Sequence, residues 1–320
     1  MTINNMQGSP LVTVGIVSYN AESFILESLN SVYNQTYQNI ELIISDDHSS
    51  DATLNIINDW LPSHKDRFVR TLVISSKVNT GTSGNGNRAI FQSNGEWYKS
   101  LDGDDILAPT AIADYVDFIR ENKDVNFVFG RIAVFHGSFD INKLEYHHPS
   151  FYGFLYKDGV TAKQQYNVLT KHFAASGSSG FYRLKILKEY GGYDERFPLM
   201  EDHPLLIKLT KEGNKLYLLD KVTLYYRISP LSITNTKTAQ NQIFSNSDKR
   251  QVVEYKYEYL RENSNKIWRV FLAYSIFLKK MIINSGNNKH SIICQLYFLW
   301  YKMTDPYLWH HRFLNIKSHS

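Results

Sequence analysis

Three carboxylates fall within five positions at Leu101-Asp-Gly-Asp-Asp105, directly after a run of residues typical of a strand. Like charges this close raise one another's pKa unless a cation or a network of donors offsets their repulsion. Carboxylate oxygens suit a hard divalent ion such as Mg²⁺ or Mn²⁺, which commonly bridges protein carboxylates and a substrate diphosphate. The alternative is a solvated Asp-Gly turn, because both residues are common in turns. The acidic loop is therefore a candidate metal and phosphate site.

The elements that must position this loop follow from hydrophobic patterning. Continuous apolar runs, typical of buried parallel strands, alternate with segments of helical periodicity. Strands are predicted at 11–17, 40–44, 70–74, 96–101, 126–129, 132–135, 181–183 and 222–226, and helices at 22–33, 52–61 and 205–209. The alternation predicts an α/β fold with a mainly parallel, Rossmann-like sheet flanked by helices.

Polar residues follow three of these strands directly. They are Ser18-Tyr19-Asn20, Asp46-Asp47 and the acidic loop. Ligands of such sheets bind outside the carboxyl ends of the strands, so these residues are expected to converge on one edge. A dinucleotide-binding protein would need a glycine fingerprint after the first strand, and no glycine follows Ser18 there.

The order of several motifs resembles a known family. The motifs are Val14-Gly-Ile-Val-Ser-Tyr-Asn20, Ile43-Ile-Ser-Asp-Asp47, Asn79-Thr-Gly81 with Asn87, Leu101-Asp-Gly-Asp-Asp105, Gly191-Gly-Tyr-Asp-Glu195 and Glu201-Asp202. Together they look like the signatures of family-2 inverting glycosyltransferases, over roughly residues 10–235. The resemblance implies a GT-A fold, a UDP-sugar donor and Mn²⁺ or Mg²⁺ as cofactor.

The resemblance assigns the donor site residue by residue. It implies that the Tyr19 ring lies against the base and that Asp47 accepts a hydrogen bond from a ring N–H such as uracil N3. The alternatives are an aromatic residue that closes the core for Tyr19 and a helix N-cap for Asp47. The full set of expected donor residues is Val17, Tyr19, Asn20, Asp47, Asn79, Asn87, Asp102, Gly103, Asp104 and Arg227.

Asp102-Gly103-Asp104 matches the DXD signature of this family. The resemblance implies that Asp104 binds the metal that bridges both phosphates, with Asp102 near the donor ribose or sugar. Many members carry a metal-binding His where this chain has Ser229, so the ion would be held by Asp104, phosphates and water. Arg227 is either a bidentate phosphate ligand or an exposed Arg beside a strand.

Inverting transfer needs a base for the acceptor hydroxyl. Glu201-Asp202 matches the acidic pair of the family, which makes Asp202 the expected general base, although acids at a helix N-terminus are also favourable for structure alone. The small-residue stretch 174–180 resembles the sugar and acceptor floor, or it is a flexible loop. The expected acceptor residues are Ser178, Ser179, Glu201 and His203, of which a lone His is more often a surface residue.

Composition bounds the class of protein. The chain has 320 residues, 43% of them hydrophobic, enough for a large core and a smaller second unit. Cys294 is the single cysteine, which excludes an intrachain disulfide and indicates a reducing compartment. The N-terminus lacks a signal-peptide pattern, and no apolar stretch reaches the roughly 20 residues of a membrane span. A cytoplasmic protein is expected, with a catalytic domain at 1–240 and a helical region at 241–320.

The C-terminal region differs in charge from the rest. Residues 248–320 hold 12 basic and 5 acidic side chains, a net +7, whereas the whole chain is +4. Helices predicted at 267–283 and 291–302 are apolar, aromatic and edged with basic residues. They would lie on the inner face of the cytoplasmic membrane, or pack on the body or on a second copy in a homodimer. Nucleic acid is not an expected partner, because the basic residues are interleaved with aliphatic ones.

The expected function is a metal-dependent inverting hexosyl transfer from a UDP-sugar to a glycan or lipid-linked saccharide, in bacterial capsule or O-antigen synthesis. Two alternatives remain. A sugar-nucleotide pyrophosphorylase would need a glycine-rich triphosphate loop after the first strand, which is missing. A catalytically silent nucleotide-sugar-binding subunit would keep the donor site without turnover.

Overall fold

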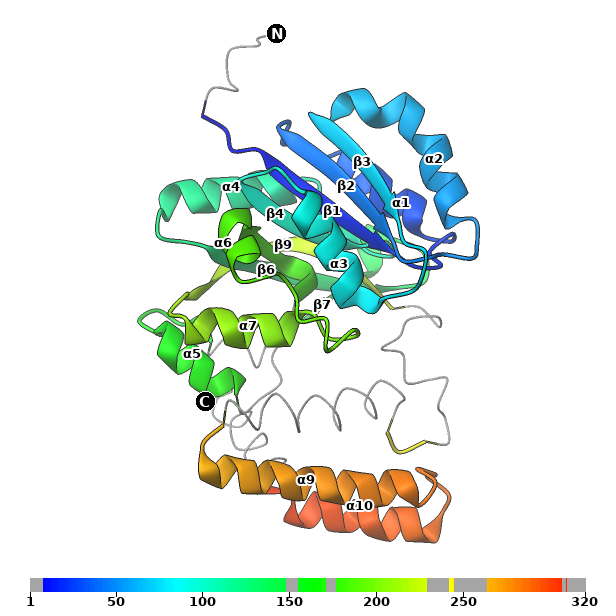
Figure 1. Cartoon of the computed structure of the whole chain (residues 1–320), viewed down its shortest axis with the longest axis vertical. Coiled ribbons are helices and arrows are strands. Elements are labelled where there is room, and N and C mark those ends of the chain that lie inside the picture. The colour runs from blue at the N-terminus through cyan, green and yellow to red at the C-terminus, as the bar shows by residue number, and fades with distance from the viewer. Residues whose placement is uncertain are drawn as a thin grey trace.

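A computed structural model describes residues 8–147, 155–170, 177–228, 242–244, 264–306 and 309. Within these residues one nine-stranded sheet runs in the order β3-β2-β1-β4-β8-β6-β9-β5, with β7 paired to β6 (Figure 1). Helices cover both faces of this sheet, and a pair of helices lies beyond it (Figure 1). The α/β class predicted from the sequence is therefore confirmed.

The N-terminal half of the sheet is parallel. Its strands are β1 (Val12–Ser18), β2 (Ile40–Asp46), β3 (Arg70–Ser75) and β4 (Trp97–Asp102), and β1 pairs in parallel with both β2 and β4. Every residue of β1 and β2 is buried, because helices cover both faces. This double burial explains why the two strands have nearly continuous apolar sequences.

The other half of the sheet is mixed, and its antiparallel pairings are short, so the sheet as a whole is mainly parallel as predicted. Its strands are β5 (Ile106–Leu107), β6 (Phe127–His136), β7 (Glu145–His147), β8 (Gly180–Arg183) and β9 (Leu216–Ile228). β8 runs antiparallel between β4 and β6, whereas β6 and β9 are parallel. The two strands predicted at 126–129 and 132–135 are one strand, whose register shifts at Gly130 and Arg131.

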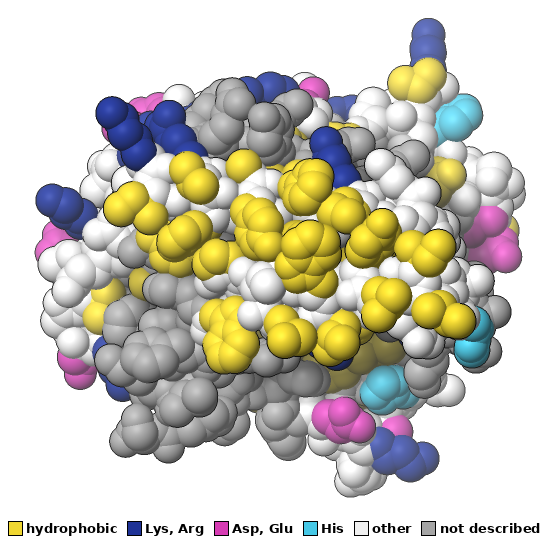
Figure 2. Space-filling view, turned by 90° about the horizontal axis from the view of Figure 1, so that it is seen from below, with side chains coloured by type: hydrophobic (Ala, Val, Ile, Leu, Met, Phe, Trp, Pro, Cys, Tyr) yellow, Lys and Arg dark blue, Asp and Glu magenta, His cyan; other side chains and the backbone are white. Residues whose placement is uncertain are grey.

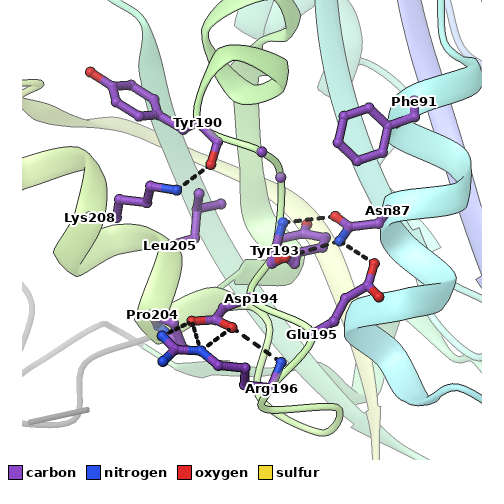
Figure 3. A pocket seen from close by; sticks show the side chains of 12 residues that line it. Asn87, Phe91, Tyr190, Tyr193, Asp194, Glu195, Arg196, Pro204, Leu205 and Lys208 are labelled. Carbon is purple, nitrogen blue, oxygen red and sulfur yellow. Dashed lines mark hydrogen bonds and ion pairs between the residues drawn. The ribbon is translucent and has the colours of Figure 1, made fainter.

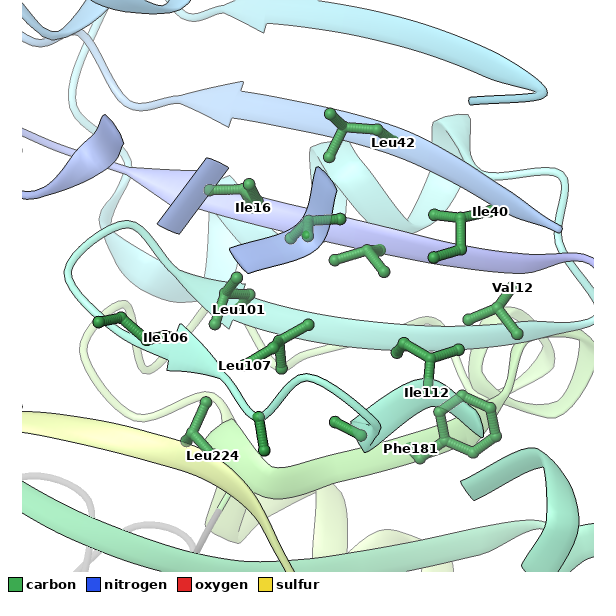
Figure 4. Packing of buried hydrophobic residues seen from close by; sticks show 14 of the residues in the cluster. Val12, Ile16, Ile40, Leu42, Leu101, Ile106, Leu107, Ile112, Phe181 and Leu224 are labelled. Carbon is green, nitrogen blue, oxygen red and sulfur yellow. The ribbon is translucent and has the colours of Figure 1, made fainter. Parts of the chain in front are cut away.

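Two cores separate the helices into layers. On one face lie α1 (Ile25–Tyr33), α2 (Thr53–His64) and α4 (Ala111–Glu121), and on the other α3 (Gly81–Gln92), α5 (Ala162–Leu169), α6 (Leu184–Glu189) and α7 (Asp202–Lys211). Because side chains alternate along a strand, Leu42 and Ile44 of β2 enter the first core and Ile43 enters the second. Figure 4 shows part of the first core, with Leu42 labelled. Short 3-10 turns lie at Lys65–Arg67, Ile141–Lys143 and Gly177–Ser179.

The two helices predicted in the C-terminal region are α9 (Lys266–Asn284) and α10 (Ile292–Thr304). Side chains of Asn265 and Ser291 cap them by accepting backbone N–H groups. No helix in the described ranges is both long and apolar enough to cross a membrane. The predicted domain boundary at 240/241 lies outside the described residues.

Candidate active site

The carboxyl ends of β1, β2 and β4 meet at one edge of the sheet. The backbone N–H of Asp47 donates to the Ser18 carbonyl at 2.9 Å, and that of Gly103 donates to the Val17 carbonyl at 2.8 Å. Gly103 lies so close to β1 that a Cβ there would come within 3.2 Å of Ser18. The three polar loops predicted to converge therefore do converge.

Tyr19 and Asn20 form the rim of this edge. Half of the Tyr19 side chain is exposed, so the ring does not close the core. Asn20 adopts a left-handed backbone with φ of 48°, and its amide oxygen accepts the backbone N–H of Ser50 at 2.9 Å. This bond joins the loops after β1 and β2 and leaves the Tyr19 ring at the surface.

Asp47 holds the N-terminus of α3. Its buried carboxylate accepts the backbone N–H groups of Thr80 and Gly81 at 2.9 and 2.7 Å, and the Thr80 hydroxyl at 2.8 Å. Arg88 adds a salt bridge of 2.5 Å. Each oxygen thus already accepts two hydrogen bonds, so a ring N–H of a base would have to share or displace one of them. Asp47 does cap a helix, but the helix is α3 and not the α2 that follows it in sequence.

Arg88 was missed by the sequence prediction. Besides Asp47, its guanidinium contacts the Thr80 hydroxyl at 2.7 Å and the Asn85 amide oxygen at 3.1 Å. Its Nε is buried and has no hydrogen-bond partner among the described residues. The only sequence signal is a basic residue one position after Asn87, and nothing local connects it with Asp47.

The acidic loop concentrates buried negative charge. Burial raises the pKa of Asp104 to about 6, with repulsion from Asp102 as a further cause. Burial also raises the pKa of Asp102 and, with repulsion from the other two carboxylates, that of Asp105 well above its usual value. One Asp105 oxygen accepts the Arg227 backbone N–H at 2.9 Å, and the other is buried without a partner among the described residues.

Lys99 is a second residue that the sequence prediction missed. It is fully buried in β4, and its ammonium group donates to the carbonyls of Ser100 and Ser178, each at 2.5 Å. Burial lowers the pKa of Lys99 to about 7, against the attraction of Asp102 and Asp105. Lys99 therefore places an amine that is only partly charged at neutral pH near Asp102 and Asp105, and it connects β4 to the 3-10 turn 177–179.

Arg227 does not lie where a phosphate could reach it, which corrects the donor-site expectation. Only 1% of the residue is exposed. Its guanidinium donates to the Asp104 carbonyl at 2.7 Å, to the Gly137 carbonyl and to Glu27 at 2.9 Å. The rings of Phe24 and Phe135 each lie 4.5 Å from its guanidinium carbon. Arg227 supports the acidic loop from inside the protein, because its side chain folds back between β9 and α1.

The acidic pair faces the same region from α7. Asp202 accepts the Gly177 backbone N–H at 3.2 Å, and Glu201 accepts the Thr82 hydroxyl at 2.9 Å. Burial raises the pKa of both carboxyl groups, that of Glu201 to about 8, with repulsion from Asp202 and Asp102 as further causes. A Cβ on Gly177 would lie 2.4 Å from the Asp202 Cβ, so this close approach requires glycine.

Of the expected acceptor residues, Ser178 lies at the site and two others are internal. The Ser178 hydroxyl donates to Asp102 at 3.1 Å. Ser179 is fully buried, and its carbonyl accepts the Tyr115 hydroxyl. His203, in the first turn of α7, is also fully buried, and its Nε2 lies 3.0 Å from the Leu169 carbonyl oxygen. The expectation that His203 contacts an acceptor is corrected, because packing against α5 removes it from the surface.

The two asparagines expected at the donor both make hydrogen bonds within the protein. Asn79 is exposed, and its amide oxygen accepts the Gly81 N–H at 3.1 Å in a local turn. Asn87 is buried: its amide donates to the Tyr193 carbonyl and to Glu195, and accepts the Tyr193 N–H at 2.8 Å (Figure 3). Asn87 thereby ties α3 to the loop 190–196, and its contact with a donor stays a prediction.

This loop, α3 and α7 also enclose a cavity of about 520 Å³, shown in Figure 3. Asn87 is the one expected site residue that lines it. Ser229 and residues 174–176, which entered the sequence prediction, lie outside the described residues.

The residues of the acidic loop fit a divalent cation. Three carboxylates repel one another there, and a buried Asp105 oxygen has no partner in the described part of the chain. Such oxygen donors match the preference of Mg²⁺ and Mn²⁺. Among the described residues, no three His, Cys, Asp or Glu side chains gather into a complete ligand set.

Solved structures share this architecture. S. aureus TarS 1-349 in complex with UDP aligns with a TM-score of 0.58 over 96% of this chain and 88% of that one, at 16% identity. A mannosyltransferase from Pyrobaculum calidifontis in complex with GDP-Man and Mn²⁺ aligns with a TM-score of 0.54 over 96% and 87%, at 17% identity. The curled, helix-flanked mixed sheet is therefore a GT-A fold.

The model of glycosyl transferase family 2 matches residues 13–191, more than half of the chain. The chain belongs to glycosyl transferase family 2. The Escherichia coli enzyme UDP-Glc:alpha-D-GlcNAc-diphosphoundecaprenol beta-1,3-glucosyltransferase WfaP is 28% identical over 71% of this chain and 81% of its own length. Three other curated relatives, from Haemophilus influenzae and Bacillus subtilis, are 29–35% identical, but the match spans only 36–50% of their length.

Proposed function

We propose that this protein is a glycosyltransferase that moves a sugar from a UDP-sugar to a hydroxyl of a glycan or lipid-linked saccharide, with inversion at the anomeric carbon. One observation carries the proposal: the acidic loop and the acidic pair contact adjacent residues of a single 3-10 turn. Asp102 accepts from Ser178, and Asp202 accepts from Gly177. A donor bound at the loop and a base on α7 would thus be held on either side of one short segment.

Asp202 is the proposed general base. Burial raises the pKa of its carboxyl group, which makes the ionised form a better proton acceptor. Glu201, whose pKa is raised to about 8, would be largely protonated at neutral pH and would leave the base role to its neighbour. Two backbone N–H groups, from Gly177 and His203, orient the Asp202 carboxylate.

Asp104 is the proposed protein ligand of a divalent ion, with the rest of the ligand set from the donor phosphates and water. Such an ion supplies Lewis-acid stabilisation of the departing diphosphate. Arg227 holds the loop in place from the interior, and Lys99 holds the 3-10 turn that Asp102 contacts. At the other end of the site, Tyr19 offers an exposed ring for the base.

The relatives favour UDP as the nucleotide of the donor. A UDP-glucose transferase aligns over most of its length, and a protein solved in complex with UDP shares the fold. Since a GDP-Man complex also shares the fold, the nucleotide needs a direct test. The acceptor class follows the same relative, whose name gives a diphosphoundecaprenol-linked sugar. Synthesis of a bacterial surface polysaccharide is the corresponding pathway.

The test is nucleotide release by the purified protein from UDP-glucose, UDP-galactose, UDP-GlcNAc and GDP-mannose, each with Mn²⁺ or with a chelator. Donor hydrolysis needs no knowledge of the acceptor. We expect release from a UDP-sugar that requires the metal. Asp202→Asn should keep donor binding and lower release at least about 100-fold, because general base catalysis is lost.

Asp124→Asn, which changes an exposed carboxylate on the loop after α4, is the matched control and should release nucleotide at the parent rate. Unchanged release by Asp202→Asn would refute the base assignment. Donor binding without release, even after addition of a bacterial lipid extract, would instead favour the silent binding subunit.

A further inference from the structure

The outer surface of the α9–α10 pair is covered with apolar side chains (Figure 2). We call this surface the hairpin face. It consists of Ile267, Val270, Phe277, Ile292, Ile293, Leu296, Leu299, Trp300 and Met303. Their exposed fractions run from 45% at Trp300 to 74% at Ile292. The spacing within each helix is helical, so both helices present an apolar stripe to the same side.

The hairpin face is not the surface that attaches the helices to the body. Leu272 and Ile276 of α9 enter the second core, and the Ser264 hydroxyl donates to the Thr170 carbonyl at 3.4 Å. Leu278 and Ile282 pack with Tyr301 between the two helices. The helix pair therefore has one apolar side packed, against the second core and between the two helices, and another apolar side exposed. The exposed side is not needed to attach the pair to the body.

The exposed charged side chains of the two helices are all positive. Across residues 264–306 the exposed charged side chains are Lys266, Arg269, Lys280, Lys289 and Lys302. The single acid in this range, Asp305, is fully buried and accepts the Ser275 hydroxyl at 2.8 Å. Figure 2 shows Lys and Arg side chains beside the apolar patch. Within residues 264–306 the surface thus combines apolar residues, an exposed Trp and positive charge without an exposed acid.

We propose that the hairpin face docks on an anionic lipid bilayer, with α9 and α10 lying along its surface. The apolar stripes would enter the boundary of headgroups and acyl chains, and the basic residues would meet lipid phosphates. Trp is favoured at this depth because its ring is apolar and its N–H is polar. A phosphate-rich surface supplies the negative charge that the hairpin lacks.

A second copy of the chain is a poorer partner for the same surface. A two-fold dimer is self-complementary, so it would place the hairpin face of one copy against that of the other. Five exposed cations of residues 264–306 from each side would then approach, and this range offers no exposed acid to pair with them. Charge complementarity therefore favours the lipid surface.

The test is flotation of the whole protein with vesicles of phosphatidylcholine alone or mixed with phosphatidylglycerol. We expect the parent to float with the anionic vesicles and much less with the neutral ones. The double variant Leu296→Ser/Leu299→Ser should reduce the bound fraction at least about tenfold, because each substitution removes an apolar side chain that would be buried in the bilayer. The matched control Val69→Ser/Val78→Ser removes equally exposed apolar groups elsewhere and should bind like the parent.

Charge is tested separately with Lys289→Glu/Lys302→Glu. The replacement of two cations by two acids should weaken binding to the anionic vesicles about tenfold or more, because both side chains would then be repelled by the lipid phosphates. Lys123→Glu/Lys185→Glu, at exposed positions on the body, is its control. Thermal melting of each variant checks that it is folded.

Two results would overturn the proposal. One is a parent protein that stays unbound with anionic vesicles at low salt. The other is a dimer in sedimentation velocity that Leu296→Ser/Leu299→Ser dissociates, which would assign the face to a second copy. Neither measurement uses a sugar donor or an acceptor. A failure of the membrane-docking proposal would therefore leave the proposed sugar transfer unaffected.

Discussion

The Thr82 hydroxyl donates a hydrogen bond of 2.9 Å to Glu201, a residue 119 positions further along the chain. Thr82 belongs to the first turn of α3, and the two residues before it are held by Asp47. A single turn of helix thus connects the carboxylate at the end of β2 with the acidic pair on α7. Any shift of α3 when a nucleotide binds would be transmitted to Glu201.

The raised pKa of Glu201 predicts a pH-dependent stability. The folded carboxyl titrates at about 8 and the unfolded one near 4.5, so between these values the folded state holds more protons. The free energy of unfolding therefore falls as the pH rises through this window. Glu201→Gln removes this titrating group and its share of the pH dependence. From pH 5 to pH 9 the melting temperature of the variant should therefore fall by roughly 2 °C or more less than that of the parent.

Burial also raises the pKa of four other carboxyl groups, so the difference between variant and parent is the relevant quantity; they are Asp102, Asp104, Asp105 and Asp202. Glu189→Gln, at an exposed position at the end of α6, should follow the parent at every pH. An equal difference between Glu201→Gln and the parent at pH 5 and pH 9 would show that the Glu201 pKa is not raised.

Arg227→Met should destabilise the protein. The substitution leaves the carbonyls of Asp104 and Gly137 without their buried donor, which costs about 2–4 kcal/mol of unfolding free energy. Urea unfolding measures this cost. Arg120→Met, which removes a half-exposed arginine from α4, should change it by less than about 1 kcal/mol.

The same pair of variants separates a structural role from phosphate binding. If Arg227 bound the donor phosphates, Arg227→Met would unfold at the parent urea concentration and lose only UDP affinity. Calorimetric titration of UDP beside the unfolding curves distinguishes the two outcomes.

Gly177→Ala should impair turnover more than donor binding. The added methyl group would meet the Asp202 Cβ at 2.4 Å, so the proposed base must move. A displacement of this kind lowers kcat about tenfold to 100-fold. UDP affinity, measured on the same protein, serves as the internal control. A normal kcat would mean that Asp202 tolerates displacement and is not the base.

Arg88→Lys should raise the KM of the donor about tenfold with little change in kcat. A lysine cannot reproduce the fork that joins Asp47, Thr80 and Asn85. Initial-rate kinetics check this split. A double-mutant cycle with Asp47→Asn should show strong coupling, since the two side chains form one salt bridge. Additive effects would instead show that Arg88 and Asp47 act independently on donor binding.

The sequence by itself determined the class of fold and the edge that carries the chemistry. Buried strands such as Val12–Ser18 are continuous apolar runs, and the polar residues that follow them are visible as soon as the strands are located. Both features are local, because hydrophobic periodicity reports burial along one segment. For the same reason the two C-terminal helices were predicted within one or two residues of their ends.

Only the tertiary structure decided what the individual polar side chains contact. Asp47 and Arg88 meet because α3 starts beside the end of β2, and Arg227 folds behind Asp104 because β9 lies next to β5. A motif position shows that a charge is present but not whether its partners come from solvent, a ligand or a segment 123 residues away. The partner of a buried polar group is set by which elements become neighbours, and that is a property of the whole fold.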